Sequence, residues 1–206
     1  MLSRRDEAEV GALALRSLSR NSRNHGKIAE TGAIQPLVAL LRNGTDESKE
    51  MAAGALYSLA CTDDNEVLIA RAGAIPPLVA LLRNGTDESK ATAAGVLEKL
   101  AYDNDKKVSI ARAGAISPLV FLVQNGSEKS KEKAAGALAA LVAIKETKEI
   151  RTDAAKQVAV RAMRNLFEND DSNRRSISDA RVSQPHRKRC PSSIPTAGPA
   201  KRTRVR

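Results

Sequence analysis

The stretch ARAGAIPPLVALLRNGTDESKATAAGVLEKLA, residues 70–101, decides the fold. Its first 21 residues, 70–90, are identical at 18 positions to residues 29–49, and residues 111–131 carry a third copy. The copies are 41 residues apart each time, without insertion or deletion. Self-similarity at a fixed period in the forties is typical of stacked α-helical units that form a solenoid.

Each copy is predicted to form three helices. In the second copy, residues 65–72 form a short helix that Gly73 ends, because glycine readily adopts the left-handed conformation found after helix C-termini. Pro76 and Pro77 fit the first turn of a second helix, where a missing N–H costs nothing.

The third helix is predicted to be capped by Thr86 or Asp87 and to end near Ala101. Apolar residues follow helical spacing along the second and third helices. Each gains about 1.5–3 kcal/mol when it is fully buried, but only stacked neighbouring units can cover these faces. The predicted core residues of this copy are Leu78, Val79, Leu81, Leu82, Val96, Leu97 and Leu100.

The repeated phrase GAI-P-LV-LL resembles the armadillo repeat in its three-helix form, and the resemblance covers roughly residues 5–143. HEAT repeats, which usually have two helices, lack this phrase. The resemblance implies an all-α fold, an armadillo-type α-solenoid wound as a right-handed superhelix, with its third helices lining a concave groove. It also implies a non-catalytic adaptor or scaffold that binds other proteins along this groove.

The repeat register predicts the organisation of the whole chain. Residues 6–19 align with a third helix that no first or second helix precedes, so Leu2, Val10 and Leu13 are candidates for exposure. Either the charged first turn caps this helix, or the helix self-associates, or the chain is shortened relative to a longer relative. The predicted segments are a partial repeat at 1–23, repeats at 24–62, 63–103 and 104–145, a capping helix at 146–169 and a disordered basic tail at 170–206.

Composition narrows the class of protein. Aromatic residues make up 2% of the chain, and there is no Trp, which argues against a β-sandwich or barrel. Cys61 and Cys190 form no cysteine framework, which favours a reducing intracellular compartment. The charged N-terminus is no signal peptide, and no apolar run approaches the ~20 residues of a membrane span, so no membrane partner is expected.

Residues that could support catalysis are scarce. His25 and His186 are the only histidines, and Cys61 has no evident partner. The sequence contains no glycine-rich phosphate loop and no metal-ligand spacing. We therefore expect no enzyme activity, no cofactor and no metal, although the fold class alone does not exclude catalysis.

The groove positions differ from those of nuclear-import receptors in the armadillo family, whose third helices carry Trp with Asn four residues later to clamp lysine-rich peptides. Leu13, Gly54, Gly95 and Gly136 stand at the Trp positions, and Ser17, Ser58, Lys99 and Ala140 at the Asn positions, so this role is disfavoured. The glycines either leave a shallow floor that a partner backbone can approach or permit tight helix packing. The predicted partner-binding residues are Ser17, Glu50, Met51, Gly54, Ser58, Thr92, Gly95, Lys99 and Gly136, with Tyr57, Glu98 and Tyr102 as further contacts.

The net charge of +10 is concentrated in the tail. Residues 171–206 contain ten Lys or Arg against two Asp, whereas residues 1–170 contain 24 against 22. Two tail clusters eleven residues apart resemble a bipartite nuclear-localisation signal, which implies a nuclear import receptor as partner and a location in the nucleus, the cytoplasm or both. Their basic residues are Arg187, Lys188, Arg189, Lys201, Arg202 and Arg204, and Ser176 and Ser178 are candidate phosphorylation sites.

Two other functions stay open. The basic tail could bind RNA or DNA through phosphates, without sequence specificity because it has no aromatic residues to stack on bases. Alternatively, the chain is the substrate-binding armadillo part of a ubiquitin ligase system, since similar repeats follow U-box domains in plant-like ligases. No U-box is found in these 206 residues, so ligase activity is not expected to be intrinsic to them.

Overall fold

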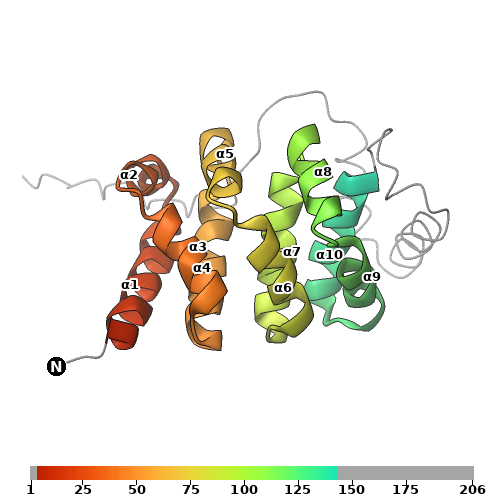
Figure 1. Cartoon of the computed structure of the whole chain (residues 1–206), viewed down its shortest axis with the longest axis horizontal. Helices are drawn as coiled ribbons and strands as arrows, with labels where there is room; N and C mark the ends of the chain where they lie inside the picture. Colours follow the sequence, from red (N-terminus) through yellow and green to blue (C-terminus); the bar gives the residue numbers. More distant parts are fainter. Residues whose placement is uncertain (1–3, 143–206) are drawn as a thin grey trace, which may run out of the picture.

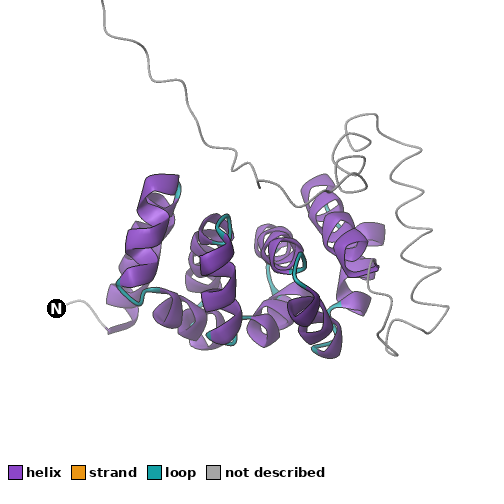
Figure 2. Cartoon of the chain, turned by 90° about the horizontal axis from the view of Figure 1, so that it is seen from above, coloured by secondary structure: helices purple, strands orange, loops and turns teal. Residues whose placement is uncertain are grey.

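A computed structural model of the chain describes residues 4–142, and within this range all regular secondary structure is helical. Figure 1 shows the helices arranged as a row of similar units along the long axis, and Figure 2 shows from above that this row is bowed. The elements are α1 (Arg4–Ser19), η1 (Ser22–Asn24), α2 (His25–Glu30), α3 (Ile34–Asn43), α4 (Asp46–Leu59), α5 (Asp63–Arg71), α6 (Ile75–Asn84), α7 (Asp87–Leu100), α8 (Asn104–Arg112), α9 (Ile116–Asn125) and α10 (Glu128–Val142).

The helices repeat at the period of the sequence. The second helices of the units, α3, α6 and α9, begin at Ile34, Ile75 and Ile116, which are 41 residues apart. Each unit has a first, a second and a third helix, and α1 is a third helix without the other two. The predicted all-α solenoid of three-helix units is therefore confirmed.

The boundaries assigned to the individual repeats stay a prediction. The capping helix expected at 146–169 and the tail expected at 170–206 lie outside the described residues. Within residues 4–142 no single helix has the length and hydropathy of a membrane span. Two bent helix pairs, α5 with α6 and α8 with α9, have the required length and hydropathy only when the two helices of a pair are taken together.

The turn between first and second helices is built on a glycine. Gly73 has φ +75°, and α5 and α6 meet there at 83°. A left-handed backbone conformation is unfavourable for residues with a Cβ, so glycine is favoured at this turn. The Arg42 guanidinium in α3 donates a hydrogen bond of 3.0 Å to the Gly73 carbonyl, and Arg83 bonds Gly114 in the same way at 3.2 Å. α3 and α6 thus each hold the turn of the next unit.

Threonine caps α4 and α7, two of the third helices. The Thr86 hydroxyl accepts a hydrogen bond of 3.2 Å from the backbone N–H of Ser89, so Thr86, rather than Asp87, is the N-cap of α7. Thr45 caps α4 in the same way. The preceding third helix supports each cap, because the Thr45 hydroxyl donates to Glu9 at 2.6 Å and the Thr86 hydroxyl donates to Glu50 at 3.3 Å.

The first helix of the first unit is weaker than its counterparts. The predicted helix of the second copy, α5, starts at Asp63, two residues earlier than expected, and has three acidic residues in its first turn. At the matching position the chain forms the 3-10 turn η1 and the six-residue α2, which have no acidic residue in their first turns. Acidic side chains stabilise helix N-termini through the helix dipole, so their absence is consistent with this shortening.

Burial in the core depends on the second helices. The third helices carry leucine at one repeated position, of which Leu59 and Leu100 are 0% exposed. α3 packs on α4 and α6 packs on α7, so each helix that carries one of these leucines has a second helix against it. No second helix covers α1 within the described residues, and Leu18 at the same position is 53% exposed. Val10 and Leu13 are also exposed, as predicted, and Leu2 lies outside the described residues.

This difference predicts that the same substitution, leucine to alanine, costs much more stability at Leu59 than at the equivalent Leu18. Leu59→Ala should lower the free energy of unfolding by about 2–5 kcal/mol, because it removes a fully buried side chain and leaves a cavity. Leu18→Ala should cost less than about 1 kcal/mol, because half of this side chain is already in water. Urea unfolding followed by circular dichroism measures both, and equal costs would show that α1 is covered in solution.

Candidate functional site

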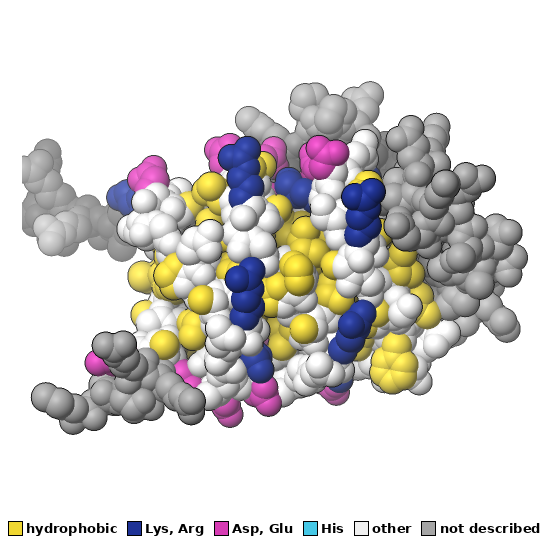
Figure 3. Space-filling view, in the orientation of Figure 1, with side chains coloured by type: hydrophobic (Ala, Val, Ile, Leu, Met, Phe, Trp, Pro, Cys, Tyr) yellow, Lys and Arg dark blue, Asp and Glu magenta, His cyan; other side chains and the backbone are white. Residues whose placement is uncertain are grey.

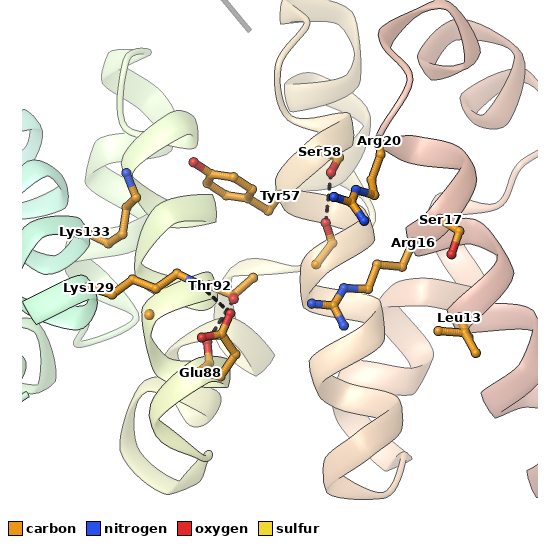
Figure 4. Close-up of a pocket in the computed structure, with 12 residues that line it drawn as sticks. Leu13, Arg16, Ser17, Arg20, Tyr57, Ser58, Glu88, Thr92, Lys129 and Lys133 are labelled. Carbon is orange, nitrogen blue, oxygen red and sulfur yellow. Dashed lines mark hydrogen bonds and ion pairs between the residues drawn. The ribbon is translucent and has the colours of Figure 1, made fainter. Parts of the chain in front are cut away.

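The third helices form the walls and floor of a groove. A hollow of about 510 Å³ lies between α1, α4, α7 and α10, on the side of the array that faces away from the viewer in Figure 1. Figure 4 shows α1 and α10 on opposite sides of it, with α4 and α7 between them. The lining residues are Leu13, Arg16, Ser17, Arg20, Gly54, Tyr57, Ser58, Glu88, Ala91, Thr92, Lys129 and Lys133.

The groove glycines are covered by side chains from the preceding unit. Arg16, Tyr57 and Glu98 occupy one repeated position in successive third helices, 41 residues apart. A Cβ added to Gly54 would lie 2.8 Å from Nε of Arg16, and one added to Gly95 would lie 2.6 Å from the ring of Tyr57.

Gly136 completes this series, because the Glu98 carboxylate occupies the space of its missing Cβ. The glycines therefore make room for a side chain from the neighbouring helix. The geometry supports tight packing between units, one of the two alternatives; that a partner backbone approaches the glycines stays a prediction.

Four of the predicted groove residues line the hollow: Ser17, Gly54, Ser58 and Thr92. The Ser58 and Thr92 hydroxyls donate hydrogen bonds to backbone carbonyls of their own helices, at 3.2 and 2.8 Å. Gly95 and Gly136 lie beneath the side chains described above. That any of these residues binds a partner stays a prediction.

Glu50, Met51 and Lys99 lie beside the hollow. The Arg16 guanidinium is 3.1 Å from the Met51 sulfur and 4.0 Å from a Glu50 oxygen. The Lys99 ammonium lies 4.9 Å from the centre of the Tyr57 ring, within the range of a cation–π contact, and 3.3 Å from Sγ of Cys61. These residues hold the groove side chains in place.

None of the charged lining was predicted from the sequence. It consists of Arg16 and Arg20 on one wall, Lys129 and Lys133 on the other, and Glu88. The signal was available, since Arg16 lies three residues after Leu13, and residues three or four apart share a helix face. The hollow thus has four cationic side chains against one carboxylate, Glu88.

The pKa values of three side chains at the edge of the groove depart from their ordinary values. Desolvation raises the pKa of Glu98, although the charges of Lys133 and Lys99 act in the opposite direction. Desolvation, followed by the charge of Glu98, raises the pKa of Tyr102. Burial would lower the pKa of Lys133, but its hydrogen bond to Glu132 and nearby negative charge raise it overall.

The chemistry available here is that of a binding surface. The lining combines cations, hydroxyls and one aromatic ring, which suit hydrogen bonds and ion pairs to another chain. Within residues 4–142, no group of three His, Cys, Asp or Glu is placed to hold a metal ion.

The chain is similar to known armadillo proteins. The family model of the plant U-box protein ARM repeat region matches residues 2–180. A designed armadillo repeat protein in complex with peptide (KR)4 has a TM-score of 0.70 at 25% identity, over 84% of this chain and 73% of that chain. An engineered protein has a TM-score of 0.73 at 25% identity, over 87% of this chain and 45% of that chain.

The ARO (armadillo repeats only) protein from Plasmodium falciparum has a TM-score of 0.67 at 19% identity, over 84% of this chain and 77% of that chain, a likeness that shows the fold alone. No curated protein sequence matches the chain significantly.

The raised pKa of Glu98 predicts that Glu98→Gln stabilises the protein at pH 7. Folding favours the protonated carboxyl, so this contribution is complete below the ordinary pKa of 4.5 and is lost as pH rises through the higher folded-state pKa. Glutamine avoids the cost of burying a charge, and its advantage should vanish below pH ~4. Urea unfolding at both pH values measures this, with Glu128→Gln, at an 87% exposed side chain, as the control that gains nothing. A stability loss at pH 7 for Glu98→Gln would refute the effect.

Proposed function

Because the chain belongs to the family of plant U-box protein ARM repeat regions, we propose that its concave groove binds an extended segment of a partner protein. Armadillo arrays are in general protein-binding scaffolds, and this fold is typically non-catalytic. The groove hypothesis is the finer statement, and it rests on this chain's own residues.

The observation that carries the proposal is the hollow itself. It draws its lining from four consecutive third helices, so a ligand along it would contact every unit in turn. An extended segment has this shape and contacts successive units as it runs across them. The similar designed protein, which was solved with peptide (KR)4, supports this mode of binding.

Tyr57 provides the test, because it is the only aromatic residue that lines the hollow within the described residues. Peptides would be selected from a random display library on the full chain, and their affinity for Tyr57→Ala would be measured by fluorescence anisotropy. Aromatic residues in a groove are frequent binding hot spots, so we expect a loss of about ten-fold or more.

Phe121→Ala is the matched control. Phe121 lies in α9, is 59% exposed and does not line the hollow, so its loss should leave affinity unchanged. The groove is not the binding site if no selected peptide distinguishes the two variants. Circular dichroism of each variant separates lost binding from lost folding.

The family match favours a second proposal about the role of this binding. The matched family is the armadillo region of plant U-box proteins, so we propose that the groove holds a protein for ubiquitin conjugation by a U-box that lies elsewhere. The same pair of variants extends to this proposal. Conjugation of ubiquitin to a bound partner in cells should fall with Tyr57→Ala and not with Phe121→Ala.

We propose further that the C-terminal basic clusters bind a nuclear import receptor. The support is their sequence, with Lys201, Arg202 and Arg204 eleven residues beyond Arg187–Arg189. An extended basic segment can enter acidic pockets on a receptor without the cost of unfolding a domain.

Replacing Lys201, Arg202 and Arg204 by alanine should therefore abolish nuclear accumulation of the full chain fused to a carrier too large to diffuse through nuclear pores. Lys27→Ala with Arg112→Ala, in α2 and α8, is the control and should leave accumulation intact. An unchanged distribution of the tail variant excludes the targeting role. Binding of nucleic acid that is steeply salt-dependent, and is lost with the same tail replacements, would indicate the phosphate-binding alternative.

A further inference from the structure

We propose that the groove selects an acidic segment, with Asp or Glu near each end of a stretch of about eight residues. This inference rests on the proposed function and specifies its ligand. It follows from where the cationic side chains stand in the hollow.

The cations face each other across the groove. Arg16 and Arg20 come from α1 and the residue that follows it, and Lys129 and Lys133 come from α10. Figure 4 shows the two pairs on opposite sides, with Tyr57 between them. A segment that spans the hollow would therefore meet positive charge at both of its ends.

Two of the four cations, Arg20 and Lys129, are exposed and available to a ligand, whereas Arg16 and Lys133 already face Glu50 and Glu132 at 4.0 and 2.9 Å. Arg20 is exposed and forms no ion pair within residues 4–142. The Lys129 ammonium pairs with Glu88 at 2.5 Å, but both side chains are about half exposed, at 57% and 43%. Exposed ion pairs contribute only about 0–1 kcal/mol, so a ligand carboxylate can replace Glu88 at little cost.

The middle of the groove carries one carboxylate and no cation. Between the two pairs of cations, the lining consists of the Tyr57 ring, Gly54, the small side chains of Ser58, Ala91 and Thr92, and Glu88 of α7, which pairs with Lys129. Glu98 holds the position of Tyr57 in the following unit. Its side chain lies against Gly136 of α10 and does not line the hollow. The single carboxylate at the centre therefore offsets only part of the positive charge of the two walls, which contribute four cations.

The distance between the walls sets the length of the segment. From α1 to α10 there are three steps between neighbouring third helices, each about 9 Å for packed helices, or about 27 Å in all. An extended chain rises about 3.3 Å per residue, so about eight residues cross the groove.

Charge also argues against basic occupants. The designed protein was solved with peptide (KR)4, but the lining of this groove, with four cations and one carboxylate, would repel such a peptide. The chain's own tail, with ten Lys or Arg against two Asp in residues 171–206, is unsuited for the same reason. Like charges across an interface disfavour the wrong partner.

The test uses the full chain and three labelled ten-residue peptides of matched spacing. One carries Asp and Glu at both ends, the second replaces these by Asn and Gln, and the third replaces them by Lys and Arg. Fluorescence anisotropy compares the wild type with Arg20→Glu/Lys129→Glu, in which one exposed cation on each wall is reversed.

The control is Lys27→Glu/Arg112→Glu, which changes the net charge equally on exposed residues outside the hollow and leaves the basic tail intact. We expect the acidic peptide to bind the wild type and the control alike, and to bind the groove variant about ten-fold or more weakly. The neutral peptide should bind the wild type more weakly than the acidic one, and the affinity for the acidic peptide should fall as salt rises.

Three outcomes would overturn the inference. Equal weakening in both double variants would mean that the tail or overall charge attracts the acidic peptide. A basic peptide that binds the wild type better, and is lost with Tyr57→Ala, would refute acidic selectivity while leaving the proposed groove function standing. An oligonucleotide that outcompetes the acidic peptide and fails on Arg20→Glu/Lys129→Glu would make the groove a nucleic-acid site.

Discussion

The structure depends on one packing arrangement, in which a third helix is buried between its own second helix and the third helices on either side. Leu59 and Leu100 are 0% exposed in helices that have both kinds of neighbour. α1 has only one of them, and Leu18 remains half in water. The stability of each unit is therefore a property of its place in the row, and the groove exists because this packing places the third helices side by side.

The fold could be predicted from the sequence because its signals are local and repeated. Gly73 follows the end of one helix, Pro76 lies in the first turn of the next, and Thr86 caps the third. Each works through its own backbone conformation or its own hydrogen bond. The 41-residue period then fixed the architecture. The first unit was harder to predict, because η1 and α2 replace one regular helix where the acidic first turn is missing.

The groove lining could be predicted only in part, because it depends on contacts between units. The glycine row is visible in the sequence, but whether Gly95 faces a partner or a side chain depends on the displacement of α4 relative to α7. No short stretch of sequence predicts how far α4 is displaced relative to α7. Arg16, Tyr57 and Glu98 share a position in the repeat yet differ in charge and size, so the repeat itself gives no reason to group them. The second helices and caps are nearly constant between copies, whereas the groove positions vary, which separates the residues that build the array from those that distinguish one groove from another.

The shared helix caps have a consequence for how the array comes apart. The Thr45 hydroxyl at the start of α4 bonds Glu9 in α1, and the Thr86 hydroxyl at the start of α7 bonds Glu50 in α4. If α1 frays, α4 loses a partner at its own first turn, and the loss is passed on from α4 to α7. Melting of α1 is thereby linked to the order of α4 and then of α7. Thermal fluctuations at the N-terminal edge would therefore reach the floor of the groove.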